Sequence, residues 1–240
     1  MTTNRKTSAR CFVIEYHISM PDGEEKRICF SLDAQTLVMQ NQQRASYPDW
    51  TKLDCHQCPH CPFDPETRVH CPVAVNIHEV VTIFASSISY EEVNVRVITE
   101  EREYSRKVPM QKAVSSLLGI GMVACDCPIM AKLKHMVRFH LPFATPLETL
   151  QRTLSSYLLA QYFRKKEGKT PDWNLAHLKK IYEDIRKLNV AMRDRLLATG
   201  KGDANVNAIV RLDVLAITAT DFLEGNLIGH LEGYFDPYLK

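Results

Sequence analysis

Several motifs that would assign a function are missing from this 240-residue sequence. The pair Gly119 and Gly121 lacks the lysine and strand context of a phosphate-binding loop. There is no Gly-x-Ser-x-Gly nucleophile elbow. His78-Glu79 does not complete a His-Glu-x-x-His zinc motif, because Thr82 stands at the second histidine position. These absences exclude the common nucleotide-binding, hydrolase and metalloprotease signatures.

The sequence also lacks a long hydrophobic run and a strong net charge. Its longest apolar stretch, residues 117–125, is interrupted by glycines and is shorter than the about 20 residues that span a membrane. The polar residues 1–10 contain no apolar segment of a secretory signal. The net charge of +2 is too weak to indicate a nucleic-acid surface. We therefore expect a cytoplasmic protein that binds neither membranes nor nucleic acid.

Strand patterns in the sequence give way to helical patterns. Alternating apolar residues predict two β-hairpins, over residues 9–32 and 93–108. Apolar residues at helical spacing predict helices over 73–86, 109–121, 128–139, 146–168, 173–198 and 204–223, with a last one from about 226. This order predicts an α+β fold, in which a small N-terminal antiparallel β-region and a helical C-terminal half are joined through a Cys-rich loop. We expect a β-rich region with the Cys-rich loop and one helix over 1–108, a helical region over 109–240, and both within one compact unit.

The eight cysteines are the most informative residues that are present. Without an export signal they are expected to stay reduced, which favours metal or redox chemistry over structural disulfides. Cys58 and Cys61 have the spacing of half a structural zinc site. Cys11 and Cys29 lie within apolar strand patterns, so we expect them to be buried in the core.

Cys71 and Cys127 are the candidates for the other half of the site. Each precedes a proline, Pro72 or Pro128, that opens a predicted helix. Proline favours the first helical position, which places each cysteine at the N-cap. There the helix dipole favours the thiolate that a metal requires. The sequence therefore predicts a tetrahedral site whose ligands are Cys58, Cys61, Cys71 and Cys127.

The choice of ligands and metal has alternatives. Weaker candidate ligands, including histidines that could replace one thiolate, are Cys55, Cys125, His60 and His70. The three-residue spacing of Cys55, Cys58 and Cys61 is also typical of iron–sulfur ferredoxins. However, the nine-residue gap before Cys71 departs from that pattern, and nearby histidines suit zinc better. Zinc is therefore the favoured metal, with an iron–sulfur cluster as the alternative.

Three short motifs carry a resemblance to a known family. They are His56-Gln57-Cys58-Pro59-x-Cys61-Pro62, Cys71-Pro72-Val73-Ala74 and His140-Leu141-Pro142-Phe143-Ala144. With these motifs the chain resembles a bacterial family of domains of unknown function, over most of its length. The resemblance implies a bacterial cytosolic protein and points to Cys58, Cys61, Cys71 and Cys127 as the matching cysteines. It implies no activity, and Cys55 and Cys125 look peculiar to this sequence.

Three functions are compatible with these residues. The first is a metal-binding protein with a structural zinc ion and a binding or regulatory role, acting on an unknown protein partner. The second is a metalloenzyme or an iron–sulfur electron-transfer protein that uses the cysteines. The third is a thiol switch in which Cys58 and Cys61, or Cys125 and Cys127, oxidise reversibly. The sequence leaves an enzymatic role open.

Overall fold

The computed structural model describes residues 11–40, 44–200, 202–224 and 229–240. Its strands are β1 (Cys11–Ser19), β2 (Glu25–Asp33), β3 (Glu92–Ile98) and β4 (Glu103–Pro109). Its α-helices are α1 (Pro72–Ile83), α2 (Met110–Val123), α3 (Lys134–Arg138), α4 (Pro146–Lys166), α5 (Ala176–Ala198), α6 (Asp203–Glu224), α7 (Gly229–Glu232) and α8 (Asp236–Leu239). Short 3-10 helices are η1 (Asp49–Thr51), η2 (Met130–Leu133) and η3 (Gly233–Phe235).

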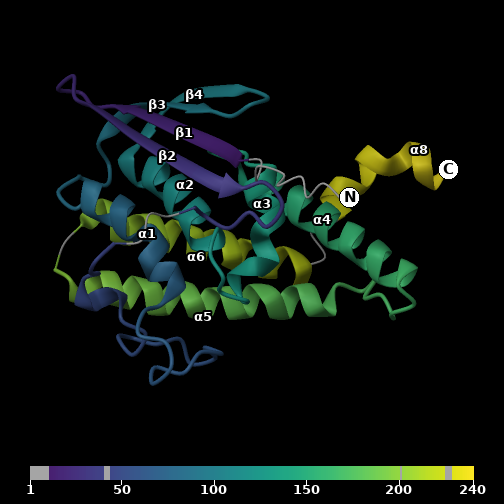
Figure 1. Ribbon diagram of the computed structural model, residues 1–240. Coiled ribbons are helices and arrows are strands. Elements are labelled where there is room, and N and C mark those ends of the chain that lie inside the picture. The colour runs from purple at the N-terminus through teal and green to yellow at the C-terminus, as the bar shows by residue number, and fades with distance from the viewer. Residues whose placement is uncertain (1–10, 41–43, 201, 225–228) are drawn as a thin grey trace, which may run out of the picture.

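The four strands form one antiparallel sheet in the order β2-β1-β3-β4, above the helices in Figure 1. Both predicted hairpins are confirmed. On β1, Ile14, Tyr16 and Ile18 are buried while Glu15 between them is exposed. This alternation shows that the helices cover one face of the sheet and leave the other to solvent.

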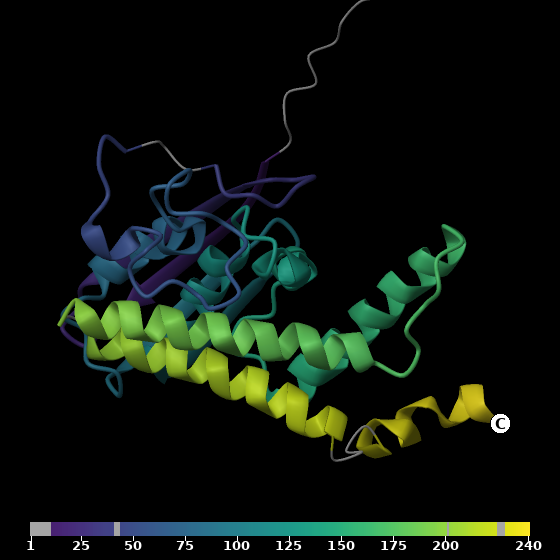
Figure 2. The same ribbon diagram turned by 90° about the horizontal axis from the view of Figure 1, so that it is seen from below.

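The helices bury that inner face in layers. α2 packs against α1 and α6, and α5 and α6 lie side by side (Figure 2). Buried residues of the sheet, α1, α2 and parts of α5 and α6 make one hydrophobic cluster. A second cluster joins α4 to the first half of α5 and the second half of α6. The α+β class is thus confirmed, and no described helix is long and apolar enough to cross a membrane.

Capping residues determine where two long helices begin. α4 begins at Pro146 as predicted, because Thr145 and Glu148 exchange side-chain and backbone hydrogen bonds in a capping box. α5 begins at Ala176, three residues later than predicted, because Leu175 adopts a left-handed backbone with φ 65°. The Asp172 carboxylate accepts a hydrogen bond from the Ala176 backbone N–H over 3.3 Å.

Some sequence predictions were wrong. The helix expected over 128–139 is divided into η2 and α3. Cys29 is exposed and Cys11 only half-buried, because the strand alternation turns Ile28 and Phe30 inward and Cys29 outward. The expected start of the last helix, near Asn226, lies outside the described residues.

Candidate functional site

The Cys-rich segment is a long loop that is closed at its base and tied to a second loop. The Leu53 N–H donates to the Val69 carbonyl over 2.8 Å, which joins the two ends of the loop. Arg68 donates two hydrogen bonds, of 2.9 and 2.8 Å, to the Asp126 carboxylate. Asp126 precedes Cys127 in sequence, so this ion pair brings Cys127 beside the Cys-rich loop.

Backbone turns position three of the predicted ligands. The Cys61 N–H donates to the Cys58 carbonyl over 3.0 Å, so the two thiols stand at either end of one tight turn. Cys71 is the N-cap of α1 and Pro72 its first residue, as predicted. Cys71 is buried, and Cys58 and Cys61 are half-buried.

Cys127 stands at the start of a turn that leads into η2. Its thiol accepts hydrogen bonds from the backbone N–H groups of Met130 and Ile129. Burial raises the pKa of the Cys127 thiol, and these two hydrogen bonds oppose that rise because they favour the thiolate. The helix predicted over 128–139 is divided, but the Cys127 thiol still receives the backbone hydrogen bonds that were expected of an N-cap position.

The four thiols act on one another electrostatically. Burial, and then the charges that Cys71, Cys61 and Cys127 carry as thiolates, raise the pKa of Cys58 to about 12. The interaction between two charges weakens as the distance between them grows. Thiols from three segments of the chain therefore lie near one another.

A buried arginine lies beside these thiols. Arg195 of α5 is 1% exposed and donates hydrogen bonds to the carbonyls of Trp50, Lys52 and Leu53 at the base of the loop. It forms no ion pair with a carboxylate of the described residues. Its positive charge offsets part of the rise in the pKa of Cys58 that burial and the neighbouring thiolates cause. A buried guanidinium without a carboxylate is a suitable neighbour for anionic sulfur.

The described residues nevertheless contain no ready-made metal site. Among them, no three His, Cys, Asp or Glu side chains are arranged to hold a metal ion. All eight cysteines are free thiols. The zinc and iron–sulfur predictions therefore stay predictions, and the four thiols are neighbours without forming a coordination sphere.

The two weaker cysteine candidates have other surroundings. Cys55 lines a shallow surface depression with Asp49 and Ala198. Cys125 is 2% exposed, and its thiol donates to the Met122 carbonyl over 3.1 Å while accepting from the Cys127 N–H over 3.4 Å. Cys125 is thus a buried thiol whose hydrogen bonds are satisfied locally.

The two weaker histidine candidates also differ from each other. His70 Nδ1 lies 2.9 Å from the Thr51 hydroxyl, and its ring packs against Tyr47. His60 has both ring nitrogens buried without a hydrogen-bond partner among the described residues. Against the effect of burial, Lys180 and Lys187, and least of all His60, lower the pKa of Asp184 on α5, so this ring lies near α5.

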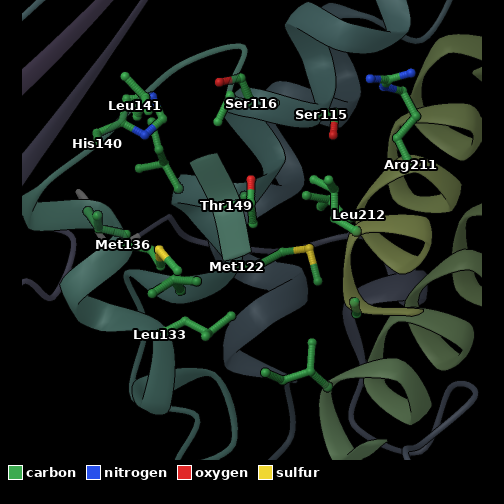
Figure 3. Close-up of a pocket in the computed structure, with 18 of the residues that line it drawn as sticks. Ser115, Ser116, Met122, Leu133, Met136, His140, Leu141, Thr149, Arg211 and Leu212 are labelled. Atoms are coloured by element: carbon green, nitrogen blue, oxygen red, sulfur yellow. The ribbon is translucent and has the colours of Figure 1, made fainter. Parts of the chain in front are cut away.

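A cavity of about 190 Å³ is the feature that the sequence analysis missed. It lies between α2, the η2–α3 segment, α4, α5 and α6, and Figure 3 shows its lining. The apolar part of the wall includes Met122, Met130, Leu133, Met136, Leu212 and Leu215. The sequence did hold a signal, because Lys112, Ser115, Ser116 and Gly119 interrupt the apolar α2 with polar or small residues on one face.

A hydrogen-bonded network joins this cavity to the sheet. Tyr16 Oη of β1 lies 2.6 Å from His140 Nε2 and 2.7 Å from Ser116 Oγ. Burial, and then the positive charge of Arg152, lower the pKa of His140 to about 3, so its ring is neutral at neutral pH. His140 opens the third motif of the sequence, which here connects α3 to α4 and lines the cavity.

Comparison with known proteins places the chain in a family. Residues 14–236 match the family described as domain of unknown function (DUF6901). The match covers most of the chain, so the chain belongs to this family. No curated protein and no solved structure matches it.

Proposed function

We propose that Cys58, Cys61, Cys71 and Cys127 bind one zinc ion, and that the chain is a metal-stabilised binding or regulatory protein. The observation that carries this proposal is the meeting of thiols from three segments beside the buried Arg195. Four sulfurs are the donor set that a structural zinc ion takes. Metal binding would displace the thiol protons, and the cation would remove the repulsion between the thiolates.

The surroundings of the thiols suit the charge of such a centre. Four thiolates and one divalent cation carry a net negative charge, which the guanidinium of Arg195 would offset. The two backbone N–H groups that point at the Cys127 sulfur would stabilise it as a ligand. Because the described side chains are not yet in a coordinating arrangement, binding requires the thiols to close on the ion.

A closed four-thiolate site favours a structural role over catalysis. It leaves no open position for water or substrate, unlike catalytic zinc sites. The ion would join the Cys-rich loop to α1 and η2, in addition to the backbone hydrogen bonds, the Arg68–Asp126 ion pair and the partly buried apolar contacts there.

Metal content per chain is the first test. The protein is purified under reducing conditions without oxygen, and elemental analysis is combined with an absorption spectrum. About one zinc per chain with no visible absorption supports the proposal. Iron with visible charge-transfer bands overturns it in favour of an iron–sulfur protein. A metal-free chain with free thiols overturns it in favour of the thiol switch.

Two matched cysteine variants test the ligand assignment. Cys58→Ser removes one proposed ligand, whereas Cys29→Ser alters an exposed cysteine on the solvent face of the sheet. We expect Cys58→Ser to lose the metal and to melt roughly 10 °C lower, because binding a structural ion contributes several kcal/mol to folding. Cys29→Ser should keep both metal and melting temperature. A Cys58→Ser protein with a full metal load contradicts the assignment.

A further inference from the structure

The cavity beside α2 has the size and wall of a small-molecule site. Its volume is about 190 Å³, and an apolar protein cavity of about 150 Å³ is enough to hold a benzene ring. Three methionines, Met122, Met130 and Met136, contribute to the wall. Their flexible thioethers adapt to irregular apolar shapes. The space therefore suits an apolar body of about one ring.

Two buried polar side chains in this wall have no partner. Ser115 of α2 is 6% exposed and Asn189 of α5 is 2% exposed, and both line the cavity. Neither the Ser115 hydroxyl nor the Asn189 amide forms a hydrogen bond with another described residue. Neither side chain is among the described ones whose fully buried polar atoms lack a partner, so their polar atoms reach the open space of the cavity. A ligand with polar atoms would supply hydrogen-bond partners there.

Cations gather at the same wall without carboxylate partners. Lys112 of α2 and Arg211 of α6 both line the cavity, and neither forms an ion pair or side-chain hydrogen bond with a described residue. Burial and the positive charges of Arg106 and Arg211 lower the pKa of Lys112, and only Glu148 opposes them. Figure 3 shows Arg211 beside Ser115, with His140 on the opposite side. This side of the cavity therefore favours an anion.

We propose that this cavity binds a small amphipathic carboxylate, with the carboxylate at Lys112, Arg211 and Ser115 and a ring-sized apolar body against the methionines. Such a ligand pairs the cations, satisfies the buried hydroxyl and fills the apolar space at once. The site is separate from the cysteine centre and does not depend on a metal ion there.

Titration of the whole purified protein with benzoate and with benzyl alcohol tests this site. The two probes share a ring and differ in charge. With methionine methyl groups labelled with carbon-13, benzoate should shift the resonances of Met122, Met130 and Met136. The resonance of Met20, in the hairpin turn, should not move. If neither probe shifts the three cavity methyls up to its solubility, or if only Met20 responds, the proposal is wrong.

Charge-removing variants test the carboxylate end. Arg211→Met should weaken benzoate binding by about ten- to a hundredfold, because the charged hydrogen bond to the carboxylate is lost, and should leave benzyl alcohol binding unchanged. Lys112→Met gives an independent second variant with the same expected direction. Arg27→Met, on the exposed face of β2, is the matched control and should bind both probes as the wild type does. Equal weakening of both probes in Arg211→Met and Lys112→Met would overturn the anionic end.

Discussion

The cysteine centre and the cavity share helix α5 but are built differently. Tyr182 and Asn189, in its first two thirds, line the cavity, whereas Arg195 near its end faces the thiols. The cavity lies between packed helices that bury apolar side chains on several sides. The cysteine centre consists of loops that reach the helices through hydrogen bonds and one buried guanidinium.

The two regions are therefore stabilised by different interactions. The helices around the cavity are held by hydrophobic burial, so the cavity itself can hold unpartnered polar groups and spare volume. The loops at the cysteine centre bury few apolar side chains, so their order depends on polar links to Arg195 and on any ion that the thiols bind. Substitutions in the two regions should therefore change the free energy of unfolding by different amounts and in different directions.

The largest effect is expected from Arg195→Met, which breaks the polar link at the base of the loop. Methionine keeps an apolar stem but leaves the carbonyls of Trp50, Lys52 and Leu53 without this donor. Each hydrogen bond lost from the guanidinium contributes about 1 kcal/mol, so the free energy of unfolding should fall by roughly 3 kcal/mol. Urea denaturation measures this change.

Arg193→Met is the matched control for that variant. Arg193 lies two positions earlier on α5, its side chain is 40% exposed, and it pairs only with the neighbouring Asp194 among the described residues. An exposed ion pair contributes little, so its loss should change stability by less than about 0.5 kcal/mol. Equal denaturation midpoints for the two variants would show that Arg195 does not hold the loop.

A pH-dependent effect of intermediate size is expected at the cavity, from His140. Burial holds the pKa of His140 at about 3 in the folded chain, against about 6.5 when unfolded. Between these values the unfolded chain binds a proton that the folded chain does not. Stability should therefore fall as pH falls below about 6.5, by about 1.4 kcal/mol per pH unit for this group. His140 is hydrogen-bonded to Tyr16, and Tyr16 is hydrogen-bonded to Ser116. The charged side chain that acts on His140 is Arg152.

The measurement compares stability at about pH 7 and about pH 5 in wild type and in His140→Gln. The wild type should lose about 2 kcal/mol more than the variant over this interval, because glutamine takes up no proton. His177→Gln, at an exposed position of α5, should behave as the wild type does. A His140→Gln protein with the wild-type pH slope would mean that His140 is protonated in the folded state.

Local patterns account for most of what the sequence could predict. Both hairpins, the start of α4 at Pro146 and the N-cap position of Cys71 follow from alternation, capping and proline geometry within a few residues. The delayed start of α5 did not follow, because the left-handed backbone at Leu175 has no sequence signature of its own. The outward direction of Cys29 required the strand register.

The sites were predictable only where contacts are local. The Cys58–Cys61 turn could be predicted from spacing alone, but the approach of Arg195 to these thiols joins residues more than a hundred positions apart. The cavity likewise needs side chains from five helical elements, and no single segment carries its pattern. Long-range packing of this kind is beyond periodicity arguments.

The smallest effects are expected from alanine substitutions at two glycines of α2. Gly119 lies on the cavity side of this helix, and Gly121 lies on the side that packs against α1. A methyl group on Gly119 would lie 3.7 Å from Leu212, an ordinary contact. A methyl group on Gly121 would lie 3.0 Å from Ile77 of α1, where the neighbour must move. Gly119→Ala should therefore stabilise by about 0.5–1 kcal/mol through helix propensity. Gly121→Ala should destabilise by about 1 kcal/mol, because overpacking exceeds that gain.

Thermal melts of the two single variants measure this difference in sign. The two positions are two residues apart in one helix, so the gain in helix propensity is common to both and cancels in the comparison. What remains is the room beside each glycine, which is present next to the cavity and absent where α1 crosses α2. If both variants gain stability equally, the α1–α2 contact adjusts as freely as the cavity wall, and the contrast between a packed core and a site with spare volume does not hold for this helix.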